Sequence, residues 1–245
     1  MDEETPRRFQ ADGHVILPSF LDASTLGAVE DEIASLGVRD PASFDEGHFF
    51  LARDGKTINQ IEHMQRYASF FDRMMREDRG VLDTVESVLG DEVVCDNVSY
   101  MAKPARVGEV VPWHQDNAYY GFTPDDALSV WIALDDCDEE NGCMRVVSGS
   151  HRRGLQPHGP TGARGISYGL VESIDPASEV NLELKRGDAS LHHCATFHAS
   201  HANGSVRSRR SVILFYHAVR CRIDQAVLDA YDRARDRMIA EAREA

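Results

Sequence analysis

Hydrophobic and polar positions follow two different periods along this chain. In the first part, from about residue 20 to 90, apolar residues recur every three or four positions, which is typical of amphipathic helices. The first such helix begins after residues 22–25 and buries a stripe formed by Leu26, Val29, Ile33 and Leu36. A second helical pattern runs from about Phe70 to Leu89, with a break near Gly80. The stretch between them, residues 38–62, is polar and predicts irregular structure.

From about residue 92 to 220 the period changes to alternation, which predicts strands. Turn signals such as Asn141-Gly142 and Gly187-Asp188 separate them. We expect strands at residues 14–17, 94–101, 113–120, 128–134, 143–147, 180–184, 190–193 and 211–216. A last helix over 223–245 has a predicted buried side of Val227, Tyr231, Ala234 and Met238.

Helices followed by many short strands predict a mainly β fold with flanking helices, in which an antiparallel sandwich or barrel forms the core. At 245 residues and 42% apolar content the chain can bury one packed core. We therefore expect a single domain over residues 1–245. It comprises a helical part at about 20–90, a β core at about 92–220 and the C-terminal helix at about 223–245.

Charge and cysteine usage narrow the class of protein. The chain carries 26 basic and 41 acidic residues, a formal net charge of −15, which argues against nucleic acid and anionic membranes as partners. Its five cysteines are odd in number and form no C-x-x-C pair. There is no secretory signal, and no apolar run approaches the roughly 20 residues that span a bilayer. These features predict a cytoplasmic protein with free thiols, of open oligomeric state (monomer or homodimer).

The segment Trp113-His114-Gln115-Asp116-Asn117 carries the first candidate chemistry. On a strand, residues two apart share a face, so His114 and Asp116 would point together. They would supply two of the three ligands of the 2-His-1-carboxylate triad that holds non-haem Fe(II). A His-x-Asp pair is more often an ordinary strand pair or surface turn, so a third ligand is needed. The candidates are His192, His193, His198 and His201, and spacing alone does not choose among them.

Arg209 adds a second kind of candidate. It lies eleven residues beyond His198 and opens an apolar strand. A guanidinium in a strand-lined pocket suits a planar carboxylate, which it can bind through two hydrogen bonds. The alternative is that Arg207, Arg209 and Arg210 form a solvated basic turn.

Taken together, three segments resemble the phytanoyl-CoA dioxygenase (PhyH) family of Fe(II)/2-oxoglutarate-dependent oxygenases. The first is Lys103-Pro104 followed by residues 112–116, and the second runs from Trp131 through Glu140-Asn141-Gly142-Cys143-Met144 to residues 149–152. The third is Gly187-Asp188 followed by His198-x-Ser200-x-x-Asn203-x-Ser205-x-x-x-Arg209. The resemblance spans roughly residues 8 to 220 and implies a double-stranded β-helix, a jelly-roll or cupin-like core.

The resemblance also implies a role for particular residues. His114, Asp116 and His198 would bind iron, with 2-oxoglutarate and O2 as co-substrates. The co-substrate contacts that it implies are made by Arg209, Ser200, Trp131, Asn97 and Ser99. The implied reaction is hydroxylation of an unactivated C–H in a small-molecule metabolite, with release of succinate and CO2. Asp116 favours hydroxylation because the related halogenases have a small residue in its place.

Two histidines depart from the family pattern. His192 stands where an aromatic or aliphatic residue is usual, and His201 stands where glycine is common. Each is either a substrate contact or an ordinary packed or solvent-facing histidine. We expect the polar segment 40–66 and the glycine-rich segment 151–178 to form the substrate mouth.

Two other functions are compatible with the same ligands. A cupin-like metalloenzyme without 2-oxoglutarate would not need Arg209, and a non-catalytic metal- or ligand-binding module would keep the fold without turnover. The substrate and its regiochemistry are not determined by these residues. The net negative charge disfavours a bulky polyanion such as a CoA ester.

Overall fold

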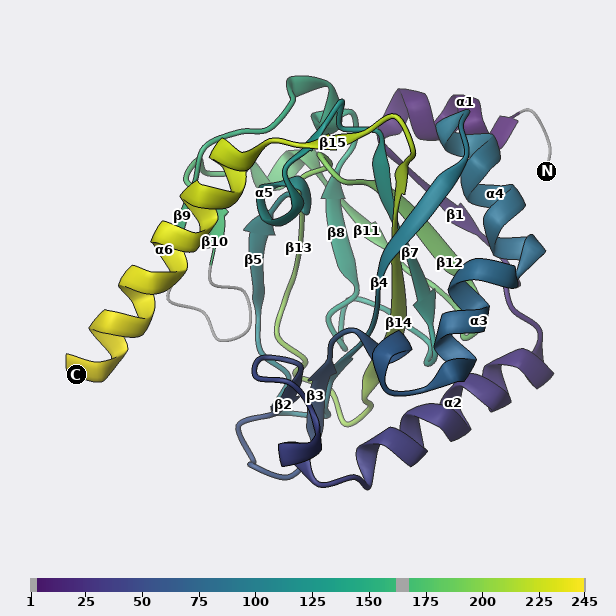
Figure 1. The fold of residues 1–245 in the computed structure, drawn as a ribbon, viewed down its shortest axis with the longest axis vertical. Coiled ribbons are helices and arrows are strands. Elements are labelled where there is room, and N and C mark those ends of the chain that lie inside the picture. Colours follow the sequence, from purple (N-terminus) through teal and green to yellow (C-terminus); the bar gives the residue numbers. More distant parts are fainter. Residues whose placement is uncertain (1–3, 162–167, 245) are drawn as a thin grey trace.

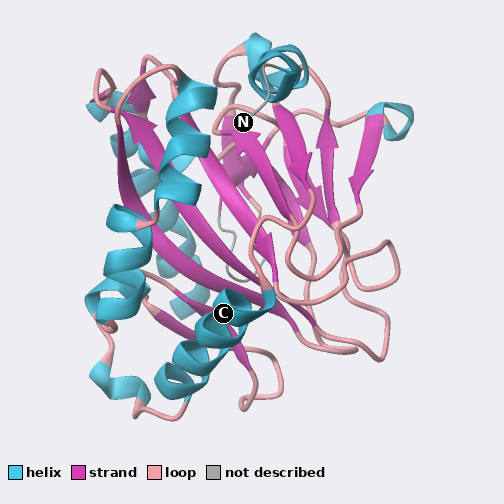
Figure 2. Cartoon of the chain, turned by 90° about the vertical axis from the view of Figure 1, so that its right-hand side faces the viewer, coloured by secondary structure: helices cyan, strands magenta, loops and turns pink. Residues whose placement is uncertain are grey.

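Two antiparallel sheets face each other in the computed structural model, which describes residues 4–161 and 168–244, with side chains as far as residue 237 (Figures 1 and 2). The larger sheet consists, in spatial order, of β1 (His14–Leu17), β12 (Ala189–His193), β7 (Ala127–Ala133), β14 (Arg209–Ala218), β4 (Val93–Lys103), β3 (Ile58–Ile61) and β2 (Phe49–Leu51). The smaller sheet consists of β11 (Glu179–Leu182), β8 (Met144–Val147), β13 (His198–Ser200) and β5 (Val111–His114). Two further strand pairs join β9 (His158–Pro160) to β10 (Tyr168–Leu170), and β6 (Phe122–Thr123) to β15 (Arg222–Ile223).

Helices cover the outer face of the larger sheet (Figure 2). They are α1 (Glu4–Asp12), α2 (Ala23–Gly37), α3 (Ser69–Glu77) and α4 (Arg79–Leu89). On the other side of the molecule, α6 (Gln225–Glu244) lies against α5 (Asn117–Tyr120), β9 and β10 (Figure 1). Short 3-10 turns are η1 (Pro41–Ser43), η2 (Met64–Arg66), η3 (Ser150–Arg153) and η4 (Pro176–Ser178). No helix in the described part of the chain combines the length and apolar character needed to cross a membrane.

Strand β14 shows that the larger sheet has two different faces: one packs against the helices, and the other faces the smaller sheet. Its residues Val212, Leu214 and Tyr216 are fully buried in the core that the helices share with the sheet. Because side chains alternate along a strand, Arg209 and Phe215 project to the opposite face, toward the smaller sheet. The mainly β architecture with flanking helices is therefore confirmed. All five cysteines are free thiols, as predicted.

One row of residues crosses the inner face of the larger sheet at a single level. Direct pairing partners, taken strand by strand from β1 to β4, are His14, His192, Ser129, Phe215 and Asn97. Side chains of directly paired residues lie on the same face of a sheet. These five side chains therefore share one height in the space between the sheets.

Two predicted elements need correction. The first is the irregular stretch 38–62, which contains β2 and β3: β2 pairs with β3, and β3 pairs with β4. The break predicted near Gly80 is confirmed and lies at Asp78, whose carboxylate caps α4 by accepting from the amides of Gly80 and Val81.

The predicted strand over 113–120 was wrong beyond His114. Residues 117–120 form the helical turn α5, whose exit residue Gly121 has φ +66°. The Asn117 side chain closes this turn by bonding both the amide and the carbonyl of Phe122. The predicted helix over 223–245 is confirmed, with Ala234 buried, while the side chain of Met238 lies outside the described residues.

Truncating the central strand should reveal how much the helix-facing core contributes. We expect Leu214→Ala to lower the free energy of unfolding by about 2–5 kcal/mol, because the side chain is fully buried and leaves a cavity. Urea unfolding followed by circular dichroism measures this. The matched control Val206→Ala, at a side chain that is 69% exposed, should change it by less than about 0.5 kcal/mol. Equal effects of the two substitutions would contradict this account of the core.

Candidate metal centre

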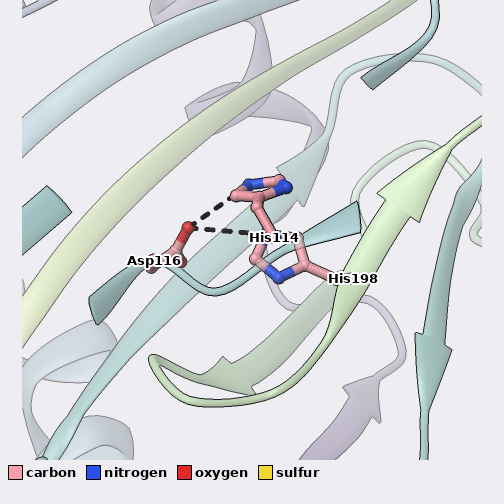
Figure 3. Close-up of side chains that lie close together, drawn as sticks. All are labelled: His114, Asp116 and His198. Carbon is pink, nitrogen blue, oxygen red and sulfur yellow. Dashed lines mark ion pairs between the residues drawn. The ribbon is translucent and has the colours of Figure 1, made fainter. Parts of the chain in front are cut away.

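Three side chains from separated parts of the chain meet between the sheets. His114 ends β5, His198 begins β13, and the two are direct pairing partners with ring centroids 4.0 Å apart. Asp116 follows β5 and turns its carboxylate toward both rings (Figure 3). One ligand atom from each residue lies within 4.8 Å of the other two. The structure thus brings together His114, Asp116 and His198, the three residues expected to form a triad.

Both imidazoles are oriented by backbone carbonyls. Nδ1 of His114 lies 2.8 Å from the carbonyl oxygen of Pro112, and Nδ1 of His198 lies 3.0 Å from that of Thr196. A carbonyl can only accept, so each Nδ1 carries a proton and each Nε2 is the nitrogen that faces the site. Such a bond on the remote nitrogen is the usual arrangement for metal-ligating histidines. The donor set and its orientation therefore fit a divalent transition metal.

The two oxygens of Asp116 have different surroundings. Oδ1 lies 3.4 Å from Nε2 of His198 and 3.7 Å from Nε2 of His114. Oδ2 accepts a hydrogen bond from Oγ of Ser129 at 2.7 Å and lies 3.3 Å from Nε2 of His192. Oδ1 is therefore the oxygen that can act as a ligand, and Oδ2 is held from behind. Asp116 has helical backbone angles, so it reaches this position through the turn before α5 rather than through strand alternation.

Electrostatics act differently on the three side chains. Burial lowers the pKa of His198, but the charge of Asp116 and its hydrogen bond outweigh burial and raise that pKa, so a proton on Nε2 of His198 competes with a metal ion. Burial, reinforced by the neighbouring His198, lowers the pKa of His114 to about 3, so its ring is neutral. Burial alone would raise the pKa of Asp116, but His198 and His192 outweigh it, and that pKa falls well below its ordinary value. The site thus offers a charged carboxylate beside a neutral imidazole.

Arg209 lies buried on the same inner face, and no acidic side chain among the described residues forms an ion pair with it. Its guanidinium stacks over Trp131, 5.0 Å from the ring centroid, and donates to the Gly142 carbonyl at 3.3 Å. Nε has no hydrogen-bond partner, and none of the ion pairs among the described residues includes Arg209. Burial lowers its pKa. An uncompensated buried cation of this kind fits a carboxylate from a bound molecule.

The neighbouring arginines behave differently. Arg207 pairs with Asp138 at 2.6 Å, and Arg210 pairs with Asp135 at 2.7 Å, both on the outer surface. The alternative of a solvated basic turn therefore holds for Arg207 and Arg210 but not for Arg209, which is buried. Lys103 is the direct partner of Arg209 across β4 and β14, and burial lowers its pKa to about 6.

The remaining predicted residues lie in different settings. Trp131 packs between the sheets, and Ser200 is buried on β13. Ser99 lies opposite Ile213 on the inner face. The Asn97 side chain is already bonded to Glu62 and to the amide of His63. Co-substrate contacts by these four residues stay predictions.

The other three histidines considered as third ligands lie in different surroundings. His192 is buried against Asp116, whereas His201 is exposed and only its carbonyl is used, as an acceptor for Lys103. His193 points away from the triad, toward Phe9 and His151. Ser129, which donates to Asp116, belongs to no motif, so the sequence did not point to it. Only pairing across the sheet shows where it lies.

Comparison with known proteins identifies relatives of the whole chain. The family model described as Phytanoyl-CoA dioxygenase (PhyH) matches residues 9–211. A protein of Stutzerimonas stutzeri described as "Probable alpha-ketoglutarate-dependent hypophosphite dioxygenase" is 28% identical over 228 residues, covering 89% of this chain and 79% of the relative. "Phytanoyl-CoA dioxygenase 1" of Oryza sativa subsp. japonica is 26% identical over 87% of this chain and 88% of its own length.

Solved structures share the fold at lower identity. EctD from S. alaskensis with bound Fe superposes with a TM-score of 0.76 at 23% identity, covering 91% of this chain and 79% of that one. EvdO2 from Micromonospora carbonacea var. aurantiaca, complexed with 2-oxoglutarate, gives a TM-score of 0.74 at 24% identity, covering 91% and 93%. The arrangement of strands and helices is therefore one that is known from solved proteins.

Proposed function

Because the chain belongs to the phytanoyl-CoA dioxygenase (PhyH) family, we propose a role for each residue of its site in a defined reaction. The protein is an Fe(II)- and 2-oxoglutarate-dependent oxygenase, in keeping with its relatives. We infer that it hydroxylates a C–H bond of a small-molecule metabolite. The arrangement that carries this proposal is the triad with its two carbonyl-oriented imidazoles, together with the unneutralised Arg209 on the same inner face.

In this proposal His114, Asp116 and His198 hold the metal and leave one side of it open. Arg209 receives the distal carboxylate of 2-oxoglutarate, with Ser200 beside it and Trp131 forming the wall of the pocket. Bound Fe(II) would activate O2, the oxidant: one oxygen atom of O2 would enter the C–H bond of the substrate and the other would enter succinate, as 2-oxoglutarate loses CO2. The protein contributes position and exclusion of water, because ion pairing by Arg209 is stronger between the sheets than in bulk water.

A cupin-like enzyme without 2-oxoglutarate is the weaker alternative. It would leave Arg209 buried with no anion to bind, which is unfavourable for a charged group. A non-catalytic module would retain both binding sites but release no product.

An anaerobic titration tests the proposal. Adding 2-oxoglutarate to the Fe(II) protein should produce a weak visible charge-transfer band, and admission of O2 should then release succinate. Absence of the band would refute the proposal, while a band without succinate would support the non-catalytic module. A screen of candidate metabolites for faster succinate release then identifies the substrate.

The residues behind Asp116 should tune metal affinity. We expect the double variant Ser129→Ala/His192→Leu to bind Fe(II) about 10–100-fold more weakly, because Oδ2 of Asp116 loses both contacts that hold it. Competition with a chelator measures this affinity. Ser190→Ala is the matched control, since Ser190 is equally buried on β12 but its hydroxyl has no partner in the structure. Unchanged affinity in the double variant would mean that Asp116 is positioned by the turn alone.

We further propose that the chain works as one domain over residues 1–245 and resides in the cytoplasm. The free cysteines support a reducing compartment. The net charge of −15 supports a small-molecule partner rather than nucleic acid or an anionic membrane. Segments 40–66 and 151–178 are proposed to form the substrate mouth; residues 162–167 of the second segment lie outside the described part of the chain.

A further inference from the structure

A second buried carboxylate lies on the inner face, away from the metal centre. Glu62 directly follows β3, in which Ile61 is fully buried in the helix-facing core. Side chains alternate along a strand, so Gln60 and Glu62 project to the opposite side, toward the space between the sheets. The Glu62 amide donates to the His48 carbonyl at 2.8 Å, which fixes the backbone at this point.

The carboxylate of Glu62 is held by two amide side chains. Oε1 accepts from Nε2 of Gln60, and Oε2 accepts from Nδ2 of Asn97 at 2.5 Å. The Asn97 oxygen is itself fixed by the amide of His63 at 2.9 Å, which determines the orientation of the Asn97 side chain. Amides orient a carboxylate but do not neutralise it, and Glu62 is absent from the ion pairs between described residues. Burial raises the pKa of Glu62, against smaller opposing effects of the two amides and of His48.

The register of the larger sheet relates Glu62 to the metal centre through one row of paired residues. Asn97, which contacts Glu62, lies in the same cross-sheet row as Ser129, which contacts Asp116. One strand, β14, separates Asn97 from Ser129, so the backbones of these two residues are about 10 Å apart at a strand spacing of 4.7–4.9 Å. Burial raises the pKa of Tyr120, and the charges of Glu62 and Asp116 add to this effect.

Both carboxylates keep solvent-accessible surface although they lie deep in the molecule. The Asp116 side chain is 17% exposed, and Glu62 is also part-exposed. Each carboxylate therefore has surface that a bound molecule can contact. Phe215 and Tyr120, stacked at 3.9 Å with 8° between their planes, form an apolar wall beside the same row.

We propose that Glu62, fixed by Gln60 and Asn97 on the inner face, binds a cationic nitrogen of the substrate, an ammonium or guanidinium. This inference rests on the proposed function and names the substrate class for it. Arg209 and Lys103 lie at the other end, six residues along β4 from Asn97. The space between the sheets thus carries negative charge at Glu62, where we place the substrate nitrogen. It carries positive charge at Arg209 and Lys103, where we place 2-oxoglutarate. Hypophosphite, named for the Stutzerimonas relative, is an anion and would be repelled by Glu62.

Three probes of equal chain length test the charge preference: hexylamine, 1-hexanol and hexanoate. Each is titrated calorimetrically into the anaerobic Fe(II) protein saturated with 2-oxoglutarate, and succinate release is then followed in air. We expect hexylamine to bind at least tenfold more tightly than the other two and to accelerate succinate release most. Equal binding of the three probes, or a preference for hexanoate, overturns the proposal without any variant being needed.

Two variants assign the preference to Glu62. In Glu62→Gln the three probes should bind within about twofold of one another, whereas Glu62→Asp, which keeps the charge, should still favour the amine. Glu46→Gln is the matched control, because it removes the same charge from an exposed site in the same segment, and it should retain the full preference. An unchanged preference in Glu62→Gln overturns the assignment.

The charge-transfer band separates this inference from the proposed function. If the band forms in the wild type and amines are not preferred, the substrate class is wrong while the oxygenase remains. If no band forms, the oxygenase proposal fails first. Thermal unfolding of each variant shows whether a lost preference reflects a lost fold.

Discussion

Asp116→Ala is expected to bind Fe(II) at least about a hundredfold more weakly than the wild type and to release no measurable succinate. The substitution removes the sole carboxylate of the triad and leaves two neutral imidazoles, which hold a divalent ion poorly. It also leaves Ser129 and His192 without the oxygen that they contact. Chelator competition gives the metal affinity, and a coupled assay gives succinate.

Asp31→Ala serves as the charge-matched control for this variant. Asp31 lies exposed on α2, on the far side of the helix-facing core from the metal centre. It should leave both iron affinity and succinate release unchanged. Full activity of Asp116→Ala would show that the metal centre lies elsewhere, and a similar loss in both variants would indicate a general effect of charge.

Arg209→Ala should lose 2-oxoglutarate and keep iron. Removing one partner of a buried ion pair typically costs about 3–5 kcal/mol, which corresponds to a 10²–10³-fold weaker affinity for the co-substrate. Titration of the charge-transfer band measures this affinity. In the wild type without 2-oxoglutarate, Arg209 has no counter-ion, so the thermal stability of Arg209→Ala should not fall below that of the wild type. Arg209→Lys should recover only part of the affinity, since a lysine cannot make the paired bonds of a guanidinium.

The adjacent Arg210 provides the control. It bonds Asp135 and Glu30 on the outer side of β14, so Arg210→Ala should leave 2-oxoglutarate affinity unchanged. The Arg210 side chain is 37% exposed and that of Asp135 is 23% exposed, so solvent screens the pair and its loss should cost about 1 kcal/mol of stability. Equal loss of co-substrate affinity in both variants would contradict the role of Arg209.

The periodicity of the sequence predicted the helices and strands better than it predicted which strands pair with one another. The helical stripe of α2 and the alternation of β7 and β14 follow from local periodicity, and both are confirmed. By contrast, β2 and β3 exist because β4 offers an edge, and no local signal in residues 38–62 reports that. The convergence of His114 and Asp116 was predicted from strand alternation, but the turn into α5 produces it.

The same limit applies to the site. Spacing left four histidines as possible third ligands, and only the resemblance to a family favoured His198. Its place opposite His114 arises from the pairing of β13 with β5, which links residues 84 positions apart. Glu62 carried no signal at all, because its setting depends on Asn97, 35 residues further along the chain. Long-range register decides which polar residues share a space, and the order of residues alone does not reveal it.

Side chains alternate between the two faces of β14, so this strand tolerates insertions and deletions of single residues poorly. Inserting or deleting one codon inside residues 210–215 would shift every later side chain to the other face. Leu214 or Tyr216 would then enter the space between the sheets, and a neighbour such as Phe215 would be forced against the helices. Indels in this strand should therefore be purged, while the surface turn near Val206, just before it, can accept them.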